Sequence, residues 1–288
     1  MHIDPPYSHL DAARQAKHSR LTYATEQDPL LQQWCIRVLE SVSGQRRINR
    51  IYAAIQTADI EDAAIWQYAL DGLRVTPGYD PARLQAIPRE GPVVFIANHP
   101  FGIVDGLMLA QIIASVRPKF AVLVNHVLCG HDPRIEQHLL PVNFGESKAA
   151  IQTNIQTKQE ALARLARGEA IGIFPSGGVA TAPGGWGKAQ DVDWKRFTAK
   201  IIQMSRATVV PIYFHGQNSR LFHLVSQFST TLRLGLLICE ANNKKGRTIP
   251  LSIGDPIPYE SLAAIRDRQA LIDHLRTTTF NLAPDARP

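Results

Sequence analysis

The strongest constraint on the fold of this chain is a series of short, largely apolar runs that alternate with helical patterns. The first run, residues 93–97, is followed by apolar residues at helical spacing up to residue 116. A run this short is typical of a strand buried on both faces, as in the interior of a parallel sheet. Further strands are predicted at residues 120–124, 139–142, 170–174, 208–214, 232–238 and 249–253. Strands that alternate with helices predict an α/β fold: a single domain with a mixed, largely parallel sheet flanked by helices.

Amphipathic patterns predict the helices between and after these strands. Residues 149–167 form the clearest pattern, with apolar anchors at Ile151, Ile155, Leu162 and Leu165. A second core-facing stripe consists of Trp194, Phe197, Ile201 and Met204. The closing helix is predicted from Leu262, Ile265, Ile272, Leu275 and Thr279.

A helical layer is expected before the sheet. Residues 1–27 are polar and unpatterned, which predicts a loose arm; residues 28–75 form the helical layer and residues 76–288 the α/β core. Ile48, Ile51 and Ile55 lie on an apolar stripe of this layer. The stripe either packs on the core, with the nearby arginines in a solvated face, or meets a membrane surface as an interfacial helix pair. The arginines concerned are Arg37, Arg46, Arg47 and Arg50.

The composition indicates an ordinary globular protein with a basic surface. The net charge is +6 and the isoelectric point about 9.3, which favours an anionic partner, although a merely solvated basic surface gives the same balance. The three cysteines lack ligand-type spacing, so neither a disulfide framework nor a metal site is predicted, and a reducing compartment is expected. No window approaches the roughly 18 apolar residues of a membrane span, and the N-terminus lacks the pattern of a signal peptide. We therefore expect a cytoplasmic protein that reaches membranes from the side, and no nucleic-acid partner.

A histidine and an aspartate follow the first buried strand. His99 comes directly after the run and Asn98, and Asp105 lies at the start of the next helical pattern. The carboxyl ends of strands in open α/β sheets are where ligands tend to bind. A histidine is suited to taking a proton near neutral pH, and an acid on its other ring nitrogen would orient it and stabilise the imidazolium. The structural alternative is a histidine that packs at a strand end and an ordinary acid in the first turn of a helix.

A second candidate site follows the strand at 170–174. Ser176, Gly177 and Gly178 are small, so their backbone N–H groups can approach an oxyanion or a phosphate closely. Ser176 is not expected to be a nucleophile, because the glycine two residues before it in a nucleophile elbow is missing. Trp186 and Lys188 lie in a loop that contacts donor or membrane, or is a plain surface loop. Asn218 and Arg220 form a polar cluster after the strand at 208–214, where a turn would use the same residue types.

Three blocks of the sequence resemble the lysophospholipid acyltransferase superfamily in order. They are residues 98–106 (NHPFGIVDG), residues 174–179 (FPSGGV) and residues 209–219 (VVPIYFHGQNS). The resemblance covers roughly residues 40 to 280. Most members have four residues between the His and the Asp, whereas this chain has five. That spacing matches a side branch often labelled putative hemolysins or ornithine-lipid acyltransferases.

The resemblance implies a glycerolipid acyltransferase-like fold and a function. His99 would be the general base and Asp105 its orienting acid, with Asn98, Gly102, Ser176, Gly177, Gly178, Asn218 and Arg220 as substrate-binding residues. Ser176 stands where the family usually has Glu. The usual phosphate-binding arginine of the second block has no clean match, since Arg134 and Lys148 are the available cations there.

The expected reaction moves a fatty acyl group from an acyl thioester to a lysolipid hydroxyl without a covalent intermediate. Acyl carrier protein or coenzyme A would be the donor, and no tightly bound cofactor is expected. The acceptor would be a glycerophospholipid or a lyso-amino-acid lipid, met at the inner face of the membrane by a peripheral protein. Two alternatives remain: a thioesterase or lipase that uses the same pair to activate water, and a non-catalytic protein that binds lipid surfaces.

Overall fold

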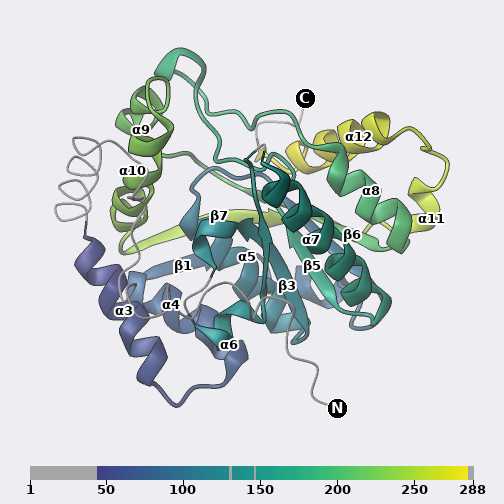
Figure 1. The fold of residues 1–288 in the computed structure, drawn as a ribbon, viewed down its shortest axis with the longest axis horizontal. Coiled ribbons are helices and arrows are strands. Elements are labelled where there is room, and N and C mark those ends of the chain that lie inside the picture. The colour runs from purple at the N-terminus through teal and green to yellow at the C-terminus, as the bar shows by residue number, and fades with distance from the viewer. Residues whose placement is uncertain (1–43, 130–131, 146, 285–288) are drawn as a thin grey trace.

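The computed structural model describes residues 44–284 apart from residues 130, 131 and 146 (Figure 1). The predicted arm and the first part of the helical layer lie outside the described residues. Within them, the strands are β1 Val75–Gly78, β2 Val93–Ala97, β3 Phe120–Asn125, β4 Leu139–Val142, β5 Ala170–Ile173, β6 Thr208–Phe214 and β7 Arg247–Ile253. The α-helices are α3 Gln45–Thr57, α4 Ile65–Leu73, α5 Ile103–Val116, α6 Pro133–Glu136, α7 Lys148–Ala166, α8 Arg196–Ser205, α9 Arg220–Val225, α10 Thr230–Asn243, α11 Tyr259–Leu262 and α12 Arg268–Phe280. Short 3-10 helices are η1 Asp62–Ala64, η2 Pro81–Ala86, η3 His126–Leu128 and η4 Pro183–Gly185.

The described strands form one sheet in the order β1-β7-β6-β2-β5-β3-β4. All neighbours pair in parallel except β6 and β7, which are antiparallel. β2 is central, because it pairs with β5 on one side and with β6 on the other. The predicted fold class, a mixed and largely parallel sheet in an α/β domain, is confirmed.

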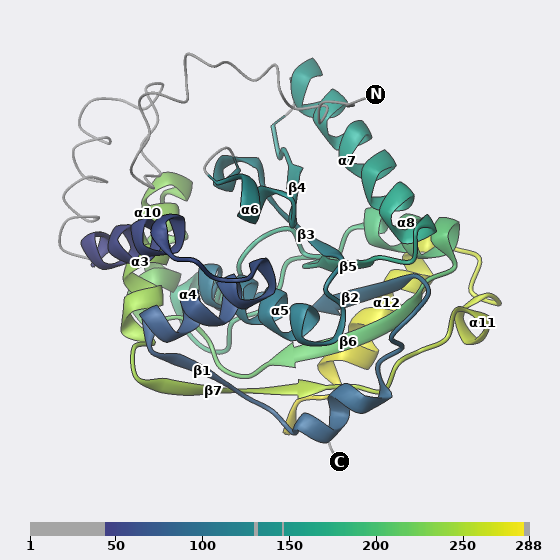
Figure 2. The ribbon, with the colours of Figure 1, turned by 90° about the horizontal axis from the view of Figure 1, so that it is seen from below.

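Helices cover both faces of the sheet. Figure 2 shows α3, α4, α5 and α10 on one side and α7, α8 and α12 on the other. The chain leaves β2 through α5 on the first face, and it leaves β5 through α8 on the second face. Ligands of open α/β sheets bind where consecutive connections leave the sheet in this way, outside the carboxyl ends of the strands. The residue that follows β2 therefore lies at the expected place for a site.

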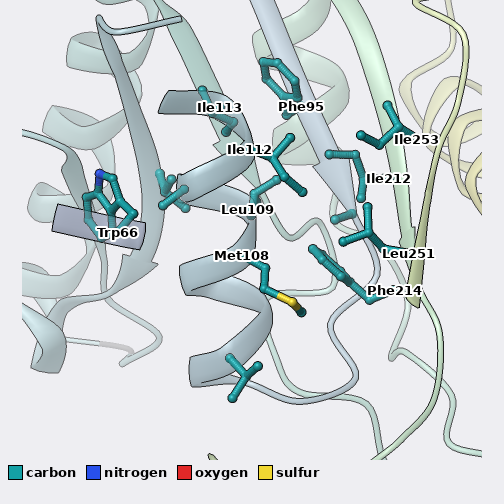
Figure 3. Close-up of a cluster of buried hydrophobic side chains, with 14 of the residues drawn as sticks. Trp66, Phe95, Met108, Leu109, Ile112, Ile113, Ile212, Phe214, Leu251 and Ile253 are labelled. Carbon is teal, nitrogen blue, oxygen red and sulfur yellow. The ribbon is translucent and has the colours of Figure 1, made fainter. Parts of the chain in front are cut away.

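The alternation of side chains along β2 explains why this strand is wholly apolar. Phe95 points into a core shared with α4 and α5, while Val94 and Ile96 belong to a second core built with α7, α8 and α12. Figure 3 shows Met108, Leu109, Ile112 and Ile113 on the side of α5 toward the sheet, near Phe95 of β2, Ile212 and Phe214 of β6, and Leu251 and Ile253 of β7. Truncation of one such side chain to alanine typically costs about 2–5 kcal/mol. This packing fixes the end of β2 and the start of α5 relative to each other.

The N-terminal helical layer packs on the core within its described part. Ile48 and Ile51 of α3 lie against the main core and Ile55 is buried. The guanidinium of Arg47 donates to the carbonyl of Gly72 at 2.8 Å, so this arginine links α3 to α4. The packing interpretation of the stripe is thus confirmed for α3.

One predicted strand is wrong. Residues 232–238 belong to α10, which begins where the hydroxyl of Ser229 accepts from the N–H of Leu232. Leu237 and Ala241 are buried four residues apart, and so are Leu236 and Glu240. The leucine-rich run resembles a strand locally although Arg233 and Gly235 interrupt it, but its burial follows the helical period because α10 packs on α3, α5 and α9.

Smaller corrections concern the outer helices and one edge of the sheet. Ile151 and Ile155 of α7 and Met204 of α8 are exposed, since α7 buries small residues such as Ala161 instead. The closing helix is interrupted: α12 starts anew at Arg268, after the cap residue Asp267, whose carboxylate accepts from the N–H of Ala270. The strand β1 was not predicted, because it is four residues long and contains Pro77, which an edge strand tolerates.

Candidate active site

The end of β2 is tied to the end of β6 by Asn98. Its side-chain N–H donates to the carbonyl of Phe214 at 3.0 Å, and its side-chain oxygen accepts from the N–H of Phe214 at 2.7 Å. Asn98 is buried. This paired contact fixes the backbone immediately before His99, so the structure gives the predicted substrate-binding Asn98 a scaffolding contact.

The imidazole of His99 and the carboxylate of Asp105 lie side by side. Nδ1 of His99 is 3.1 Å from Oδ1 of Asp105, whose side chain is fully buried. The other oxygen, Oδ2, accepts from the backbone N–H of Phe101 at 2.8 Å. The ring of Phe174, at the end of β5, stacks on the imidazole with 4.0 Å between centroids. Because Asp105 occupies the Nδ1 side, Nε2 is the ring nitrogen that is placed to take a proton.

Gly102 makes the turn between the histidine and the helix possible. Its φ of 88° lies in the left-handed region, and a Cβ at this position would lie 2.8 Å from Cδ2 of Leu237. Glycine is therefore required both for the turn and for the close approach of α10. With one more residue than the usual four between His and Asp, the turn still brings the two side chains together.

A second acid, Asp191, holds the backbone of the histidine. Its Oδ1 accepts from the N–H of His99 at 3.2 Å, and its Oδ2 accepts from Nε1 of Trp194 at 3.0 Å. Burial raises the pKa of the Asp191 carboxyl, and the hydrogen bonds from these two N–H donors lower it by less. The carbonyl of His99 accepts in turn from the N–H of Ala180 at 2.7 Å. Both backbone polar groups of the histidine are thus fixed by the segment that follows β5.

The loop after β5 closes on itself beside the histidine. The hydroxyl of Ser176 donates to the carbonyl of Gly178 at 3.0 Å, and the N–H of Gly177 donates to the carbonyl of Phe174 at 2.9 Å. Ser176 is buried. The hydroxyl and this N–H therefore serve the turn, while the glycines keep the loop narrow. Among the described residues, no cluster of three or more His, Cys, Asp or Glu side chains could hold a metal ion.

Comparison with known proteins shows which family the chain belongs to. The family model described as Acyltransferase matches residues 64–285, which is most of the chain and includes the whole site. The chain belongs to this acyltransferase family. The predicted resemblance to the lysophospholipid acyltransferases is thereby confirmed.

Two curated relatives of this chain are each named lyso-glycine lipid O-acyltransferase. The protein from Phocaeicola vulgatus is 29% identical over 187 residues, which cover 62% of this chain and 63% of the relative. The protein from Bacteroides thetaiotaomicron is 25% identical over 207 residues, covering 69% of this chain and 73% of the relative. The chain thus matches somewhat less than two thirds of the length of the first relative.

The fold of this chain also resembles a solved one. The crystal structure of the 1-acyl-sn-glycerophosphate (LPA) acyltransferase PlsC from Thermotoga maritima matches with a TM-score of 0.50 and 15% sequence identity. The match covers 88% of this chain and 94% of that chain. It supports the glycerolipid acyltransferase-like architecture that the sequence predicts.

The structure places Asn218 and Arg220 in different surroundings. Asn218 is buried and its side-chain N–H faces the carbonyl of Phe101 at 3.4 Å, so it touches the turn between His99 and Asp105. It also lines a polar hollow of about 300 Å³ with Ser219, Glu240, Lys244 and Arg247, among others. Arg220 is exposed on α9, with its guanidinium carbon 5.4 Å from the centroid of the Trp186 ring. Asn218 belongs to the site, whereas Arg220 belongs to an outer surface.

Arg233, a cation on α10 beside the loop after β5, was not among the predicted site residues. Its guanidinium donates to the carbonyl of Val179 at 2.6 Å, and it lies 3.7 Å from where a Cβ on Gly178 would be. Burial lowers the pKa of Arg233. The sequence did not indicate this residue, because residues 232–238 were predicted as a strand and their helical packing places Arg233 beside this loop.

The two cations near the second block of the family, Arg134 and Lys148, lie away from the site. The guanidinium of Arg134 donates to carbonyls of Ile55 and Ala58 and therefore joins α6 to α3. Lys148 is exposed at the start of α7. Asp191 was missed as well, because it stands in a loop without periodicity and nothing local marks it.

Proposed function

We propose that this protein is an O-acyltransferase that moves a fatty acyl group from an acyl thioester to the hydroxyl of a lysolipid. The observation that carries the proposal is the His99–Asp105 pair, 3.1 Å apart at the carboxyl end of the central strand. Membership of the acyltransferase family supports the same reaction. The names of the two relatives support a lysolipid as acceptor.

The proposed mechanism is direct transfer. Nε2 of His99 takes the proton of the acceptor hydroxyl as that oxygen attacks the thioester carbonyl, and Asp105 stabilises the imidazolium that forms. The tetrahedral intermediate then expels the thiolate, which receives the proton from His99, so the products are an ester and a free thiol. Direct transfer needs no enzyme nucleophile. In agreement, the Ser176 hydroxyl is buried and bonded within its own turn.

For the acceptor we propose a lyso-amino-acid lipid, with a lysoglycerophospholipid as the other candidate. Arg233 supports an acceptor with an anionic group, because it is a partly desolvated cation at the loop after β5. A guanidinium can bind either a carboxylate or a phosphate through two parallel N–H bonds. The relatives' names favour the first of these groups.

For the donor we propose a thioester of acyl carrier protein or of coenzyme A. Both are anionic, and the described surface has a basic hollow of about 460 Å³ between α8 and the start of α12. Its lining includes Arg196, Lys200, Arg266 and Arg268 against the single acid Asp267. The hollow is close to the site along the chain. Trp194, two residues before Arg196, donates a hydrogen bond to Asp191 of the site.

We propose that the reaction takes place at a membrane surface, on the cytoplasmic side, because the acceptor is an amphiphile of the bilayer. None of the described helices is long and apolar enough to cross a membrane. The protein would then bind the bilayer peripherally.

The test is an acyl transfer assay with purified full-length protein. Radiolabelled acyl carrier protein and coenzyme A thioesters are each offered with lyso-amino-acid lipids and lysoglycerophospholipids. We expect labelled ester with at least one pair, and a loss of about 10³-fold in His99→Ala, the range typical of a general base. The exposed His274 on α12 provides the matched control, His274→Ala, which should keep wild-type activity. Labelled free fatty acid formed without any acceptor would instead establish a hydrolase.

A further inference from the structure

Large apolar side chains are exposed together directly after η4, on α9 and on the turn that follows α9. Trp186 exposes 63% of its surface, Leu221 62% and Phe228 84%, and Leu224 is exposed as well. We call these four residues the apolar tip. In Figure 1, α9 stands at the margin of the molecule opposite to α11. Soluble surfaces seldom gather such residues without an interaction that covers them.

The apolar tip is a defined surface rather than a collection of loose side chains. Leu221, Leu224 and Phe228 follow at steps of three and four residues, which places them on one face of α9 and its continuation. Phe222, on the opposite face, is fully buried. The loop with η4 packs on this helix, because a Cβ on Gly185 would lie 3.1 Å from Cδ1 of Leu224. The N–H of Ala182 also donates to Nδ1 of His223 at 3.3 Å.

The charge of the tip indicates what covers it. Arg220 lies over the Trp186 ring, with 5.4 Å from the guanidinium carbon to the ring centroid, and Lys188 follows two residues after this tryptophan. Aromatic and leucine side chains beside cations are the combination found on surfaces that lie at the boundary of an anionic bilayer. The net charge of +6 acts in the same direction.

Both parts of the tip are anchored to the turn between His99 and Asp105, which we call the catalytic turn. Upstream of η4, the N–H of Ala180 donates to the carbonyl of His99. Immediately before α9, the side chain of Asn218 faces the carbonyl of Phe101. A surface that rests on the tip would therefore be held in a fixed position relative to His99.

We propose that the apolar tip is the surface through which this protein docks on a bilayer that contains anionic lipids. Trp186, Leu221, Leu224 and Phe228 enter the boundary between headgroups and acyl chains, and Arg220 and Lys188 meet the anionic headgroups. The docking surface deepens the proposed function, because it presents the catalytic turn to an acceptor that resides in the bilayer. The measurement of docking itself does not depend on catalysis.

The test is co-sedimentation of the full-length protein with vesicles of phosphatidylcholine, with and without phosphatidylglycerol. We expect Trp186→Ser/Phe228→Ser to bind the anionic vesicles at least about tenfold more weakly than the wild type, because each aromatic residue buries a large apolar area. Arg220→Gln should weaken binding to anionic vesicles alone, and salt should reduce that difference. The matched control, Met204→Ser/Tyr68→Ser, removes two other exposed side chains and should bind as the wild type does.

A second readout separates docking from catalysis. With a short-chain, monomeric acceptor, the tip variant should keep wild-type turnover, whereas turnover of a vesicle-borne acceptor should fall with binding. Trp186 should also shift its fluorescence emission to the blue on addition of anionic vesicles, and Trp186→Ser should lose this shift. Failure of all acyl transfer would refute the proposed function and leave the binding result intact. Unchanged vesicle binding in the tip variant, or an equal loss of binding in the control variant, would overturn the proposed docking surface. Binding of an acyl carrier protein to the apolar tip, instead of a bilayer, would overturn it as well.

Discussion

In the proposed mechanism, the reaction depends on how a single histidine is held. His99 is fixed through its ring by Asp105 and Phe174, through its N–H by Asp191, and through its carbonyl by Ala180. A general base contributes most when it is held within hydrogen-bond reach of the proton that it removes. If His99 is the general base, we expect the contacts to its backbone to affect the rate as well as the fold.

Asp191→Asn tests the backbone contact. An amide has one acceptor oxygen and two N–H donors, so the variant cannot accept from both His99 and Trp194, and one donor meets another. A lost bond to a charged acceptor costs about 1.5–3 kcal/mol. We therefore expect a roughly tenfold or larger loss in kcat, measured by the transfer assay, with little change in the KM for either substrate. An equal kcat in wild type and variant would show that this contact has no part in positioning His99.

The same residue gives a prediction for pH. Burial raises the pKa of Asp191 above its ordinary value of 3.8. At a pH between 3.8 and the raised pKa, the folded chain therefore holds a proton that the unfolded chain has lost. This group therefore lowers the free energy of unfolding as pH rises through that window. Urea unfolding at a series of pH values above 3.8 should show a steeper decline for the wild type than for Asp191→Asn. Parallel pH profiles would contradict the assignment.

At the scale of elements, the β2–α5 turn needs Gly102 for two separate reasons. Alanine there would meet both a positive φ and a Cβ that lies 2.8 Å from Leu237. Gly91→Ala is a matched control, since its φ is 76° and a Cβ would meet nothing within 4 Å. We expect both variants to lose stability in thermal unfolding, and Gly102→Ala to lose about 1–3 kcal/mol more and most of its activity. Equal loss in the two would mean that the contact with α10 is unimportant.

The position of α10 explains why the strand predicted at 232–238 is wrong and why Arg233 was not predicted. Local apolarity favours a strand for residues 232–238, whereas the Ser229 cap and packing against α3 and α5 establish the helix. The helix brings Arg233 to the loop after β5. The sequence alone therefore concealed a cation of the candidate site, just as it concealed Asp191 in its unpatterned loop.

Arg233→Gln tests whether that cation binds the acceptor. We expect the KM for an anionic acceptor to rise about tenfold or more while the KM for the donor stays unchanged, because a hydrogen bond to a charged group is lost. Arg233→Lys keeps the charge without the planar guanidinium, so its KM for the acceptor should lie between those of the wild type and Arg233→Gln. Lys148→Gln, at the exposed start of α7, should leave both constants at wild-type values. A change in the donor KM alone would assign Arg233 to donor binding.

At the scale of the whole molecule, the predictable part of the fold is the part set by local rules. The buried run of β2, the glycine turn and the helical spacing of α5 are read directly from consecutive residues, and the structure confirms them. The order of the strands is different, because it depends on pairings such as β1 with β7, which join residues far apart in sequence. The site depends on the same long-range arrangement, which brings the ends of β2, β5 and β6 together.

A double-mutant cycle on His99 and Asp105 tests the central claim, that the two side chains act as one catalytic unit. Rates of acyl transfer are compared for the wild type, His99→Ala, Asp105→Asn and the double variant. If Asp105 acts only through His99, the double variant should be no slower than His99→Ala, because residues that act as a unit have strongly non-additive effects. Rate losses that multiply in the double variant would contradict the claim, since each residue would then contribute to the reaction on its own.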